Sequence, residues 1–242
     1  MLDRLAAAAW PGLIIEPYEG WLFRAAGGVT KRANAVLPLG EVTDADRAID
    51  AAEAFAAAHG IPPLFQLSPA SVPADLAERL LARGYAPIDR TMVLTGSVAA
   101  ALAALGEGPQ ARLADEPDAA WLDAWWAVDG RGGAAELELA RRILAGARSR
   151  YASVGSSDAT GRLAYVDAPD GTPWVGLYAL ATRPEARRRG HARTIIRSLL
   201  QDAHERGVDR LWIQVLAANA SALSLYTALG CTPASEYAYW RR

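Results

Sequence analysis

Arginines concentrate in one short segment of the sequence, from Ala181 to Ala192. Three consecutive arginines, Arg187 to Arg189, stand directly before Gly190. Eight arginines against four carboxylates between Arg183 and Arg210 give a local charge of +4, in a chain whose net charge is −2. Guanidinium groups beside a backbone that a glycine leaves open are suited to binding a phosphate or pyrophosphate.

A buried strand and an amphipathic helix are predicted on either side of this segment. Residues Trp174 to Ala181 form a nearly continuous apolar run, which is typical of a central strand buried on both faces. From Ala192 to Ala203 the apolar residues recur with helical spacing, and Gly207 follows. The helix would begin at the arginines, so its free N–H groups and positive dipole end would add to the anion site. Runs of charged residues usually form solvated loops. The position of these arginines, between a buried strand and a helix, favours a ligand site instead. The segment has neither a Walker motif nor a GxGxxG motif.

Two stretches of similar order are predicted, residues 1–108 and 109–242, joined by a linker at Gly106 to Gln110. Expected strands and helices in the first part are Gly12 to Glu16, Trp21 to Ala25, Arg32 to Leu39, a helix beginning at Thr43 or Asp44, Leu64 to Leu67, a helix at Ala74 to Arg83, and Thr91 to Thr95. In the second they are Ala111 to Ala114, helices at Asp118 to Val128 and Ala134 to Ala147, Arg150 to Val154, Arg162 to Asp167, Leu211 to Leu216, a helix at Ala220 to Leu229, and Tyr237 to Trp240.

Two motifs of the second part resemble those of the GNAT superfamily of N-acetyltransferases. Arg187 to Ala192 is similar to the [QR]-x-x-G-x-[GA] loop that binds the pyrophosphate of acetyl-CoA. Asn219 to Gly230 is similar to the family's N-x-x-[AS]-x-x-[LF]-Y-x-x-x-G element. The resemblance covers roughly residues 111–242. It implies an α/β (α+β) GNAT fold, a mixed and mostly antiparallel twisted sheet flanked by helices, with a smaller GNAT-like α/β domain before it.

The resemblance also implies roles for individual residues. Tyr226 would act as general acid toward the leaving CoA thiolate, because a phenol stays protonated at neutral pH; helical spacing alone would place it in the core. Asn219 would cap its helix and contact acetyl-CoA, and a backbone N–H at the strand end would stabilise the thioester oxygen. The expected cofactor-binding residues are Leu180, Ala181, Thr182, Arg187, Arg188, Arg189, Gly190, His191, Ala192, Arg193, Asn219 and Ser221.

The first part resembles the same superfamily more faintly. Its strand-to-helix junction, Leu37 to Asp44, has no arginine and two carboxylates, which would repel a pyrophosphate. We therefore interpret it as a GNAT-like domain without cofactor. Trp10-Pro11, Gly20-Trp21 and Thr30 to Asn34 resemble the N-terminal halves of some bacterial two-domain members.

The acyl acceptor and the general base stay open at this stage. Asp129, Glu136, Glu138 and Asp167 are candidates for a base or for attracting a cationic acceptor, and a chain of water molecules could serve equally. Five aromatic residues could line an acceptor pocket or pack in the core: Trp121, Trp125, Trp126, Trp174 and Tyr178.

Composition bounds the remaining possibilities. A net charge of −2 disfavours a globally basic nucleic-acid binder, and no apolar stretch is long enough to indicate a membrane span. The single cysteine, Cys231, and three scattered histidines predict no metal site. Cys231 stands where the family usually carries an aromatic residue, and we expect it to be buried and structural. The expected protein is cytoplasmic, a monomer or a homodimer.

Two functions remain. The first is an acetyl-CoA-dependent N-acetyltransferase that acts on a primary amine by direct attack. The second is a catalytically silent GNAT-fold protein that binds an acyl-CoA as a sensor or scaffold. Two intact motifs in one domain favour the first, while the missing base and the first part's lack of a cofactor loop keep the second open.

Overall fold

The computed structural model describes all residues from 1 to 242. Its strands form one sheet of eight strands and one of three. The large sheet has the order β4-β11-β5-β10-β9-β8-β7-β6, in which only β9 and β10 are parallel neighbours. This mixed, mostly antiparallel sheet flanked by helices is the GNAT fold that the sequence predicts. No helix is both long enough and apolar enough to span a bilayer.

The bounds of the elements are as follows. The large sheet contains β4 (Phe65–Leu67), β5 (Ala86–Ser97), β6 (Arg112–Ala114), β7 (Ser149–Val154), β8 (Ala159–Asp167), β9 (Pro173–Thr182), β10 (Arg210–Leu216) and β11 (Thr232–Arg241). The small sheet contains β1 (Ile14–Tyr18), β2 (Trp21–Ala25) and β3 (Leu37–Pro38). The helices are α1 (Leu2–Ala9), α2 (Ala45–Ala58), α3 (Leu76–Ala82), α4 (Val98–Leu105), α5 (Ala119–Asp129), α6 (Ala134–Ala145), α7 (His191–Glu205) and α8 (Ala220–Ala228), with short 3-10 turns η1 (Lys31–Ala33) and η2 (Pro184–Ala186).

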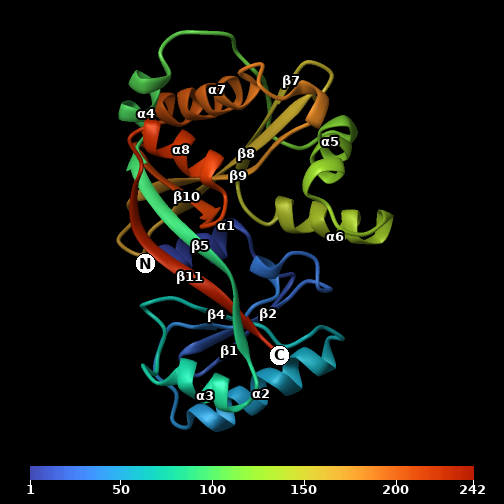
Figure 1. Cartoon of the computed structure of the whole chain (residues 1–242), viewed down its shortest axis with the longest axis vertical. Helices are drawn as coiled ribbons and strands as arrows, with labels where there is room; N and C mark the ends of the chain where they lie inside the picture. The colour runs from blue at the N-terminus through green and yellow to red at the C-terminus, as the bar shows by residue number, and fades with distance from the viewer.

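The long strands β5 and β11 connect the two ends of the molecule. They run antiparallel from the end that carries α4 and α8 toward the end that carries α2 and α3 (Figure 1). At the upper end α7 packs on β7, β8 and β9. A Cβ at Gly161 of β8 would come within 2.4 Å of Ile195 Cγ2, so this glycine lets α7 lie close to the sheet.

The first and second parts of the chain share a sheet and a core. β4 and β5 precede residue 108, yet both lie inside the large sheet, and β5 separates β10 from β11. Trp10 packs in one cluster with Trp125 and Tyr178. Buried Arg162 joins the parts further, because it donates to the carbonyls of Ala9 (2.9 Å) and Leu144 (3.0 Å). The division at residue 108 stays a prediction, and deleting residues 1–108 would remove the small sheet, two strands of the large sheet and part of this core.

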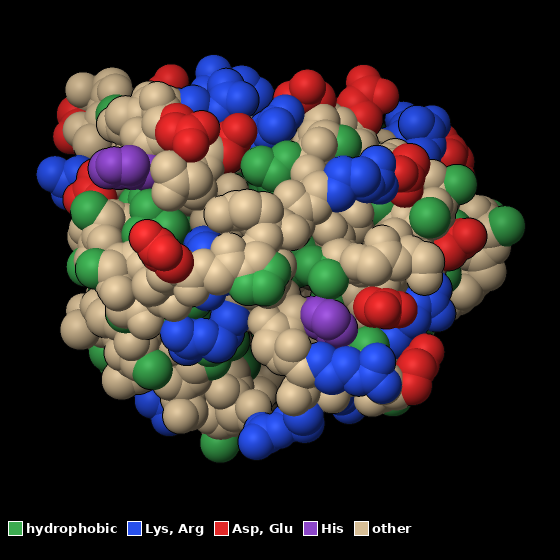
Figure 2. Space-filling model, turned by 90° about the horizontal axis from the view of Figure 1, so that it is seen from above, with side chains coloured by type: hydrophobic (Ala, Val, Ile, Leu, Met, Phe, Trp, Pro, Cys, Tyr) green, Lys and Arg blue, Asp and Glu red, His purple; other side chains and the backbone are tan.

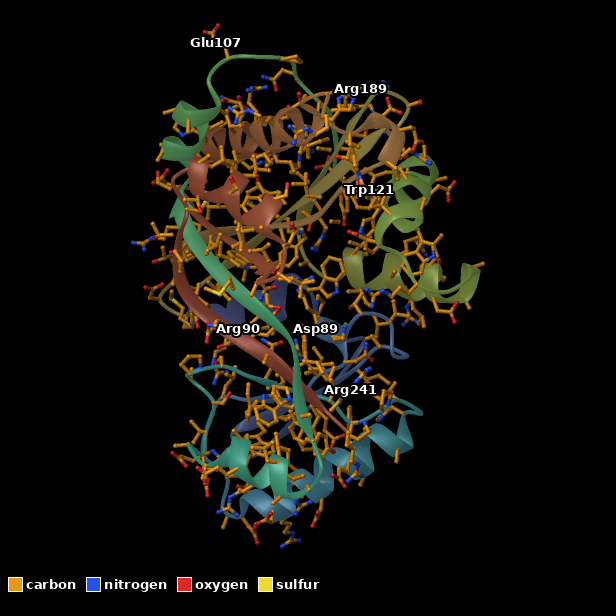
Figure 3. The ribbon with its side chains drawn as sticks, in the orientation of Figure 1. Asp89, Arg90, Glu107, Trp121, Arg189 and Arg241 are labelled. Atoms are coloured by element: carbon orange, nitrogen blue, oxygen red, sulfur yellow. The ribbon has the colours of Figure 1, made fainter.

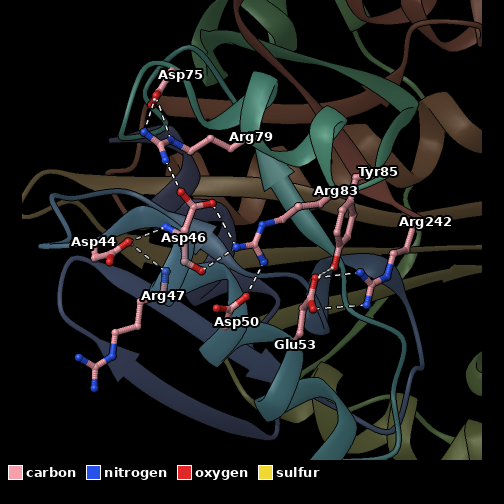
Figure 4. A network of polar contacts seen from close by, with 10 residues as sticks. All are labelled: Asp44, Asp46, Arg47, Asp50, Glu53, Asp75, Arg79, Arg83, Tyr85 and Arg242. Carbon is pink, nitrogen blue, oxygen red and sulfur yellow. Dashed lines mark hydrogen bonds and ion pairs between the residues drawn. The ribbon is translucent and has the colours of Figure 1, made fainter.

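Ion pairs and a buried apolar interface join α2 and α3 in the small part at the lower end. Arg79 and Arg83 of α3 contact Asp46 of α2, and Arg83 also contacts Asp50 (Figure 4). These side chains are partly exposed, so each pair adds little to stability. The apolar faces of α2 and α3, with Ile49 and Leu80 fully buried, make the larger contribution.

One predicted strand is wrong in most of its length, and two helices were not predicted. Residues 32–39 contain a 3-10 turn and only two strand residues, Leu37 and Pro38. The reason is Asn34, whose side chain binds four backbone groups and fixes a loop there. The unpredicted helices are α1 and α4.

Candidate active site

The parallel strands β9 and β10 separate toward their carboxyl ends. They pair in register from Trp174 with Arg210 to Leu177 with Ile213. Beyond that point β9 continues to Thr182 and β10 to Leu216, with no pairing between them. Backbone groups on the facing edges are therefore left free of the ladder, which gives a wedge-shaped opening in the sheet.

A bulge in β9 forms the wall of this opening. Two residues of β9, Ala179 and Leu180, lie opposite the single residue Gly161 of β8. Ala179 has a positive φ of 49°, which a side chain other than glycine adopts only when its surroundings impose it. A bulge redirects the strand and frees backbone groups, so the predicted segment Leu180 to Thr182 borders the opening.

The N-terminus of α7 presents backbone N–H groups that no protein atom accepts. Its N-cap, Gly190, has φ 81° and no side chain, and the first intrahelical bond is from Thr194 N to Gly190 O. The amides of residues 188–193 find no acceptor within the protein. A row of free amides at the positive end of a 15-residue helix is a site for an anion.

The three predicted arginines directly precede this helix end in the chain. Arg187, Arg188 and Arg189 are exposed, and Arg188 has a positive φ of 63°, so the loop curls around the helix end. Figure 3 shows Arg189 at the end of the molecule that carries α7. Seen from that end, Lys and Arg side chains form separate patches between acidic ones rather than one basic face (Figure 2).

Arg193 differs from the other predicted residues of this loop. Its guanidinium donates to the carbonyls of Ala104 (3.3 Å) and Leu105 (3.5 Å) at the end of α4. Arg197 does the same for the linker, with bonds to Gly106 O (2.9 Å) and Pro109 O (3.2 Å). These two side chains hold α7 against the preceding chain, and only the backbone of Arg193 faces the open helix end.

Helix α8 starts directly after β10 and carries the second motif. Asn219 is its N-cap and accepts a bond from Ala222 N at 3.1 Å, so the predicted capping role is confirmed. Tyr226 packs against the large core with 7% of its surface exposed. Burial, with smaller contributions from Cys231 and from the charge of Asp129, raises the pKa of Tyr226 to about 12. Ser221 is exposed in the first turn.

A cavity of about 560 Å³ lies between the first part of the chain and the second. Its wall includes residues 27–34 and Asp89 from the first part, and Trp125, Asp129 and Leu216 from the second. Leu216 is the last residue of β10, so the cavity reaches the carboxyl end of this strand. Figure 3 shows Asp89 and Arg241, which also line it, where β5 and β11 approach the small sheet.

Of the four candidate acids, Asp129 and Glu136 line the cavity, and Glu138 and Asp167 do not. Asp129 faces the cavity and lies within electrostatic reach of Tyr226. Desolvation by the surrounding protein raises the pKa of Asp129, while Trp125, Arg32 and Arg131 oppose that shift. Glu136 also lines the cavity but accepts the Gly133 amide at 2.7 Å, and Glu138 is paired with Arg141. Asp167 pairs with Pro173, at the opposite end of β9 from the opening.

The five candidate aromatic residues fall into two groups, those that line the cavity and those that lie only in the core. Trp125 and Trp126 line the cavity. Trp121, Trp174 and Tyr178 are buried in the core, where Tyr178 accepts a bond from Trp212 at 3.1 Å. The sequence analysis did not identify Arg32, Tyr237 and Tyr239 as lining residues. Cys231 is 2% exposed, as predicted, and burial raises the pKa of its thiol to about 11.

The fold, the opening between β9 and β10 and the open end of α7 define an acetyltransferase of the GNAT superfamily. A GCN5-related N-acetyltransferase from Kribbella flavida has a similar fold, with a TM-score of 0.66 at 18% identity over 99% of this chain and 94% of that chain. A tandem GNAT protein from the clavulanic acid biosynthesis pathway gives a TM-score of 0.65 at 13% identity, covering 100% of this chain and 87% of that chain.

The chain belongs to the family described as "Probable histone acetyltransferase Rv0428c C-terminal", which matches residues 1–240. It is 32% identical over 230 residues to the probable histone acetyltransferase Rv0428c of Mycobacterium tuberculosis, covering 92% of this chain and 68% of that protein. It is 28% identical over 244 residues to the uncharacterized N-acetyltransferase YobR of Bacillus subtilis, covering 98% of this chain and 96% of that protein.

Proposed function

We propose that the protein transfers an acetyl group from acetyl-CoA to a primary amine by direct attack, in the cytoplasm, as a monomer or homodimer and without a metal. The observation that carries the proposal is the row of unaccepted amides at the N-terminus of α7, beside the opening between β9 and β10. These amides can bind the pyrophosphate of acetyl-CoA. The opening between β9 and β10 lies next to them, so the thioester of the bound molecule can enter the sheet there. Acetyl-CoA supplies the activated acetyl group.

Each part of the site has a separate task. The amides of residues 188–193 and the arginines Arg187 to Arg189 bind the pyrophosphate, and Asn219 and Ser221 border the same groove from α8. A backbone N–H in Leu180 to Thr182 stabilises the thioester oxygen as it gains negative charge, which is often the largest single contribution to such reactions.

Tyr226 donates a proton to the leaving thiolate in this proposal. Its pKa of about 12 keeps the phenol protonated at neutral pH, and a thiolate is a strong enough base to take that proton during the reaction. We expect turnover to persist as the pH rises to about 10, because ionisation of Tyr226 removes the acid only as the pH approaches 12.

The substitution Tyr226→Phe tests the function. We expect kcat to fall about 100-fold or more, because general acid catalysis contributes roughly that much, while calorimetry shows unchanged acetyl-CoA affinity. The assay is thiol release with a panel of primary amines. The panel includes a lysine peptide, because the mycobacterial relative is named a histone acetyltransferase.

Three outcomes distinguish the possibilities. Loss of turnover with retained binding supports Tyr226 as the acid. An unchanged rate in Tyr226→Phe removes it from that role. Tight acetyl-CoA binding by the unmodified protein, with no thiol release for any amine, would instead support a catalytically silent sensor or scaffold.

A further inference from the structure

The cavity between the two parts of the chain holds charges of both signs that are not paired with each other. Arg32 enters it from η1 of the first part, and Asp129 enters it from the end of α5 in the second. The two act on each other electrostatically but form no ion pair. Other charges in the cavity have protein partners: Lys31 binds Asp89 at 2.6 Å, and Glu136 binds the Gly133 amide at 2.7 Å.

The loop that carries Arg32 is fixed by hydrogen bonds. The Asn34 side chain accepts from Ala26 N (2.7 Å) and Gly28 N (3.0 Å). It donates to the carbonyls of Val29 (2.8 Å) and Thr30 (2.7 Å). All four bonding positions of a 6% exposed amide are therefore used to shape the loop. A loop built this rigidly presents Arg32 in a preorganised position.

Two buried polar atoms in the cavity wall have no hydrogen-bond partner within the protein. One is Arg32 Nε, and the other is the hydroxyl of Tyr239, whose side chain is only 4% exposed. Buried polar groups are nearly always satisfied, so these two atoms are available to a polar ligand in the cavity. Arg32 also lies 5.8 Å above the Tyr178 ring, with Tyr237 and Tyr239 nearby, and it forms no ion pair with a protein carboxylate.

Asp129 provides the opposite charge close to the reacting groups. It acts on Tyr226 electrostatically, and the cavity that it lines reaches Leu216 at the end of β10. An ammonium group bound to Asp129 would thus lie beside the opening where the acetyl group is expected. Desolvation by the protein around it raises the pKa of Asp129, although the residue stays accessible to solvent.

We propose that this cavity binds an acceptor that carries both an amine and a carboxylate, with Asp129 accepting the ammonium proton and Arg32 pairing with the acceptor's carboxylate. The proposal rests on the acetyltransferase function above. It gives the first part of the chain a role in choosing the substrate. A volume of about 560 Å³ suits a small molecule of amino-acid size.

Protons pass through Asp129 and Tyr226 during the transfer. Asp129 takes one proton from the ammonium, and the free amine nitrogen forms a bond to the acetyl carbon while the carbon–sulfur bond breaks. Tyr226 gives its proton to the sulfur and recovers one from the acylated nitrogen. The products are the amide, the CoA thiol and one proton, which leaves Asp129 for solvent.

Matched acceptors test the role of Arg32. The rates of thiol release are compared for 6-aminohexanoate and hexylamine, for 4-aminobutanoate and butylamine, and for a lysine peptide. The unmodified protein should prefer the carboxylate-bearing member of a pair by about 10- to 100-fold in kcat/KM, the range expected for a charged hydrogen-bonded pair. Equal rates within both pairs, or faster transfer to the peptide than to either amino acid, would overturn the proposal.

Variants then assign the preference to a residue. Arg32→Gln should abolish the preference and Arg32→Lys should restore part of it, whereas Arg47→Gln is the matched control, because Arg47 lies on α2 away from the cavity (Figure 4). Thermal unfolding shows that each variant is folded. A preference that survives in folded Arg32→Gln contradicts the assignment.

Asp129→Asn tests the proton acceptor. It should lower kcat about 100-fold near neutral pH, and the deficit should shrink as the pH approaches that at which the free amine predominates. An unchanged pH profile would contradict this role. The groups that also face Asp129 and shape that profile are Arg32, Arg131, Glu136, Tyr226, Tyr237 and Tyr239.

Calorimetry separates failure of this proposal from failure of the acetyltransferase function. If acetyl-CoA binds but no amine releases thiol, the function fails. Binding of 6-aminohexanoate in the presence of CoA, lost in Arg32→Gln and kept in Arg47→Gln, still supports the cavity assignment. Absence of that binding in the unmodified protein overturns it.

Discussion

The chain contains two strand-to-helix junctions of similar order, one before α2 and one before α7. The two helix N-termini differ in whether the protein itself binds their free amides. At the start of α2, the Asp44 carboxylate accepts from the amides of Asp46 (3.0 Å) and Arg47 (3.1 Å) (Figure 4). Glu19 accepts from the Thr43 amide just before it. At the start of α7, Gly190 has no side chain and the following amides find no acceptor. One junction is closed by the protein's own carboxylates, and the other is left open for an anion from outside.

The open junction needs stability from elsewhere in α7. A missing N-cap costs a helix about 1 kcal/mol. Helix α7 offsets this with an apolar face in which Ile195, Leu199 and Leu200 are fully buried. At its far end Asp202 binds Arg206 at 2.7 Å and Arg150 at 3.1 Å. Burial alone would raise the pKa of Asp202, but hydrogen bonds from Arg206 and Tyr165 and the charge of Arg150 hold it below its usual value. Packing thus anchors the helix, and its first turn is free to serve a ligand.

Gly190→Asp should convert the open junction into a closed one. The carboxylate would lie beside the free amides of α7 and repel a phosphate there, so we expect acetyl-CoA affinity to fall roughly 100- to 1,000-fold. Nothing lies within 4 Å of a Cβ built at this position, so the change is not a steric one. The measurement is calorimetric titration with acetyl-CoA.

The control for this variant is Gly190→Asn, which has the same shape and the same positive-φ strain without the charge. It should weaken binding about tenfold or less, because Asn adopts this conformation more readily than most residues. If Asn and Asp weaken binding equally, the amides of α7 are not an anion site and the contrast between the junctions has another cause.

Replacing Arg187, Arg188 and Arg189 by Gln has a smaller expected effect. The three side chains are exposed, so solvent and salt screen their charges. We predict about tenfold weaker acetyl-CoA binding at low salt, with the difference from the unmodified protein shrinking as salt is raised. A loss that does not depend on salt would indicate that the variant had reshaped the loop rather than removed charge.

The sequence predicts the two junctions well because their signals are local. Three arginines before a glycine, and an aspartate before an alanine-rich helix, each lie within one turn of the backbone they serve. Helix α4 also has a local signal that was overlooked: Ser97 caps it at Ala100 N (3.1 Å), and Gly106 follows its end.

The cavity could not be predicted in the same way. Arg32 and Tyr239 meet there only because β11 pairs with β4 and β5 from the first part of the chain, a pairing that no local pattern records. The strand predicted over residues 32–39 also gave Arg32 the wrong surroundings. A pattern of apolar residues cannot show that the Asn34 side chain binds the backbone of residues 26–30 and forms a loop. Asp129 is one of four candidate acids in the sequence, but its proximity to Tyr226 can be seen only in the fold.

The smallest effect is expected from substitutions of Asp44, which caps α2 at the closed junction. Asp44→Ala should destabilise the protein by about 1 kcal/mol through loss of the cap, which corresponds to a Tm about 2–4 °C lower for a chain of this size. Asp44→Asn should keep most of the stability, because its side-chain oxygen can accept the same two amides. Acetyl-CoA affinity should be unchanged in both. A weaker affinity in Asp44→Ala would mean that the α2 junction also takes part in binding the cofactor, and the division of labour between the two helix ends would then be wrong.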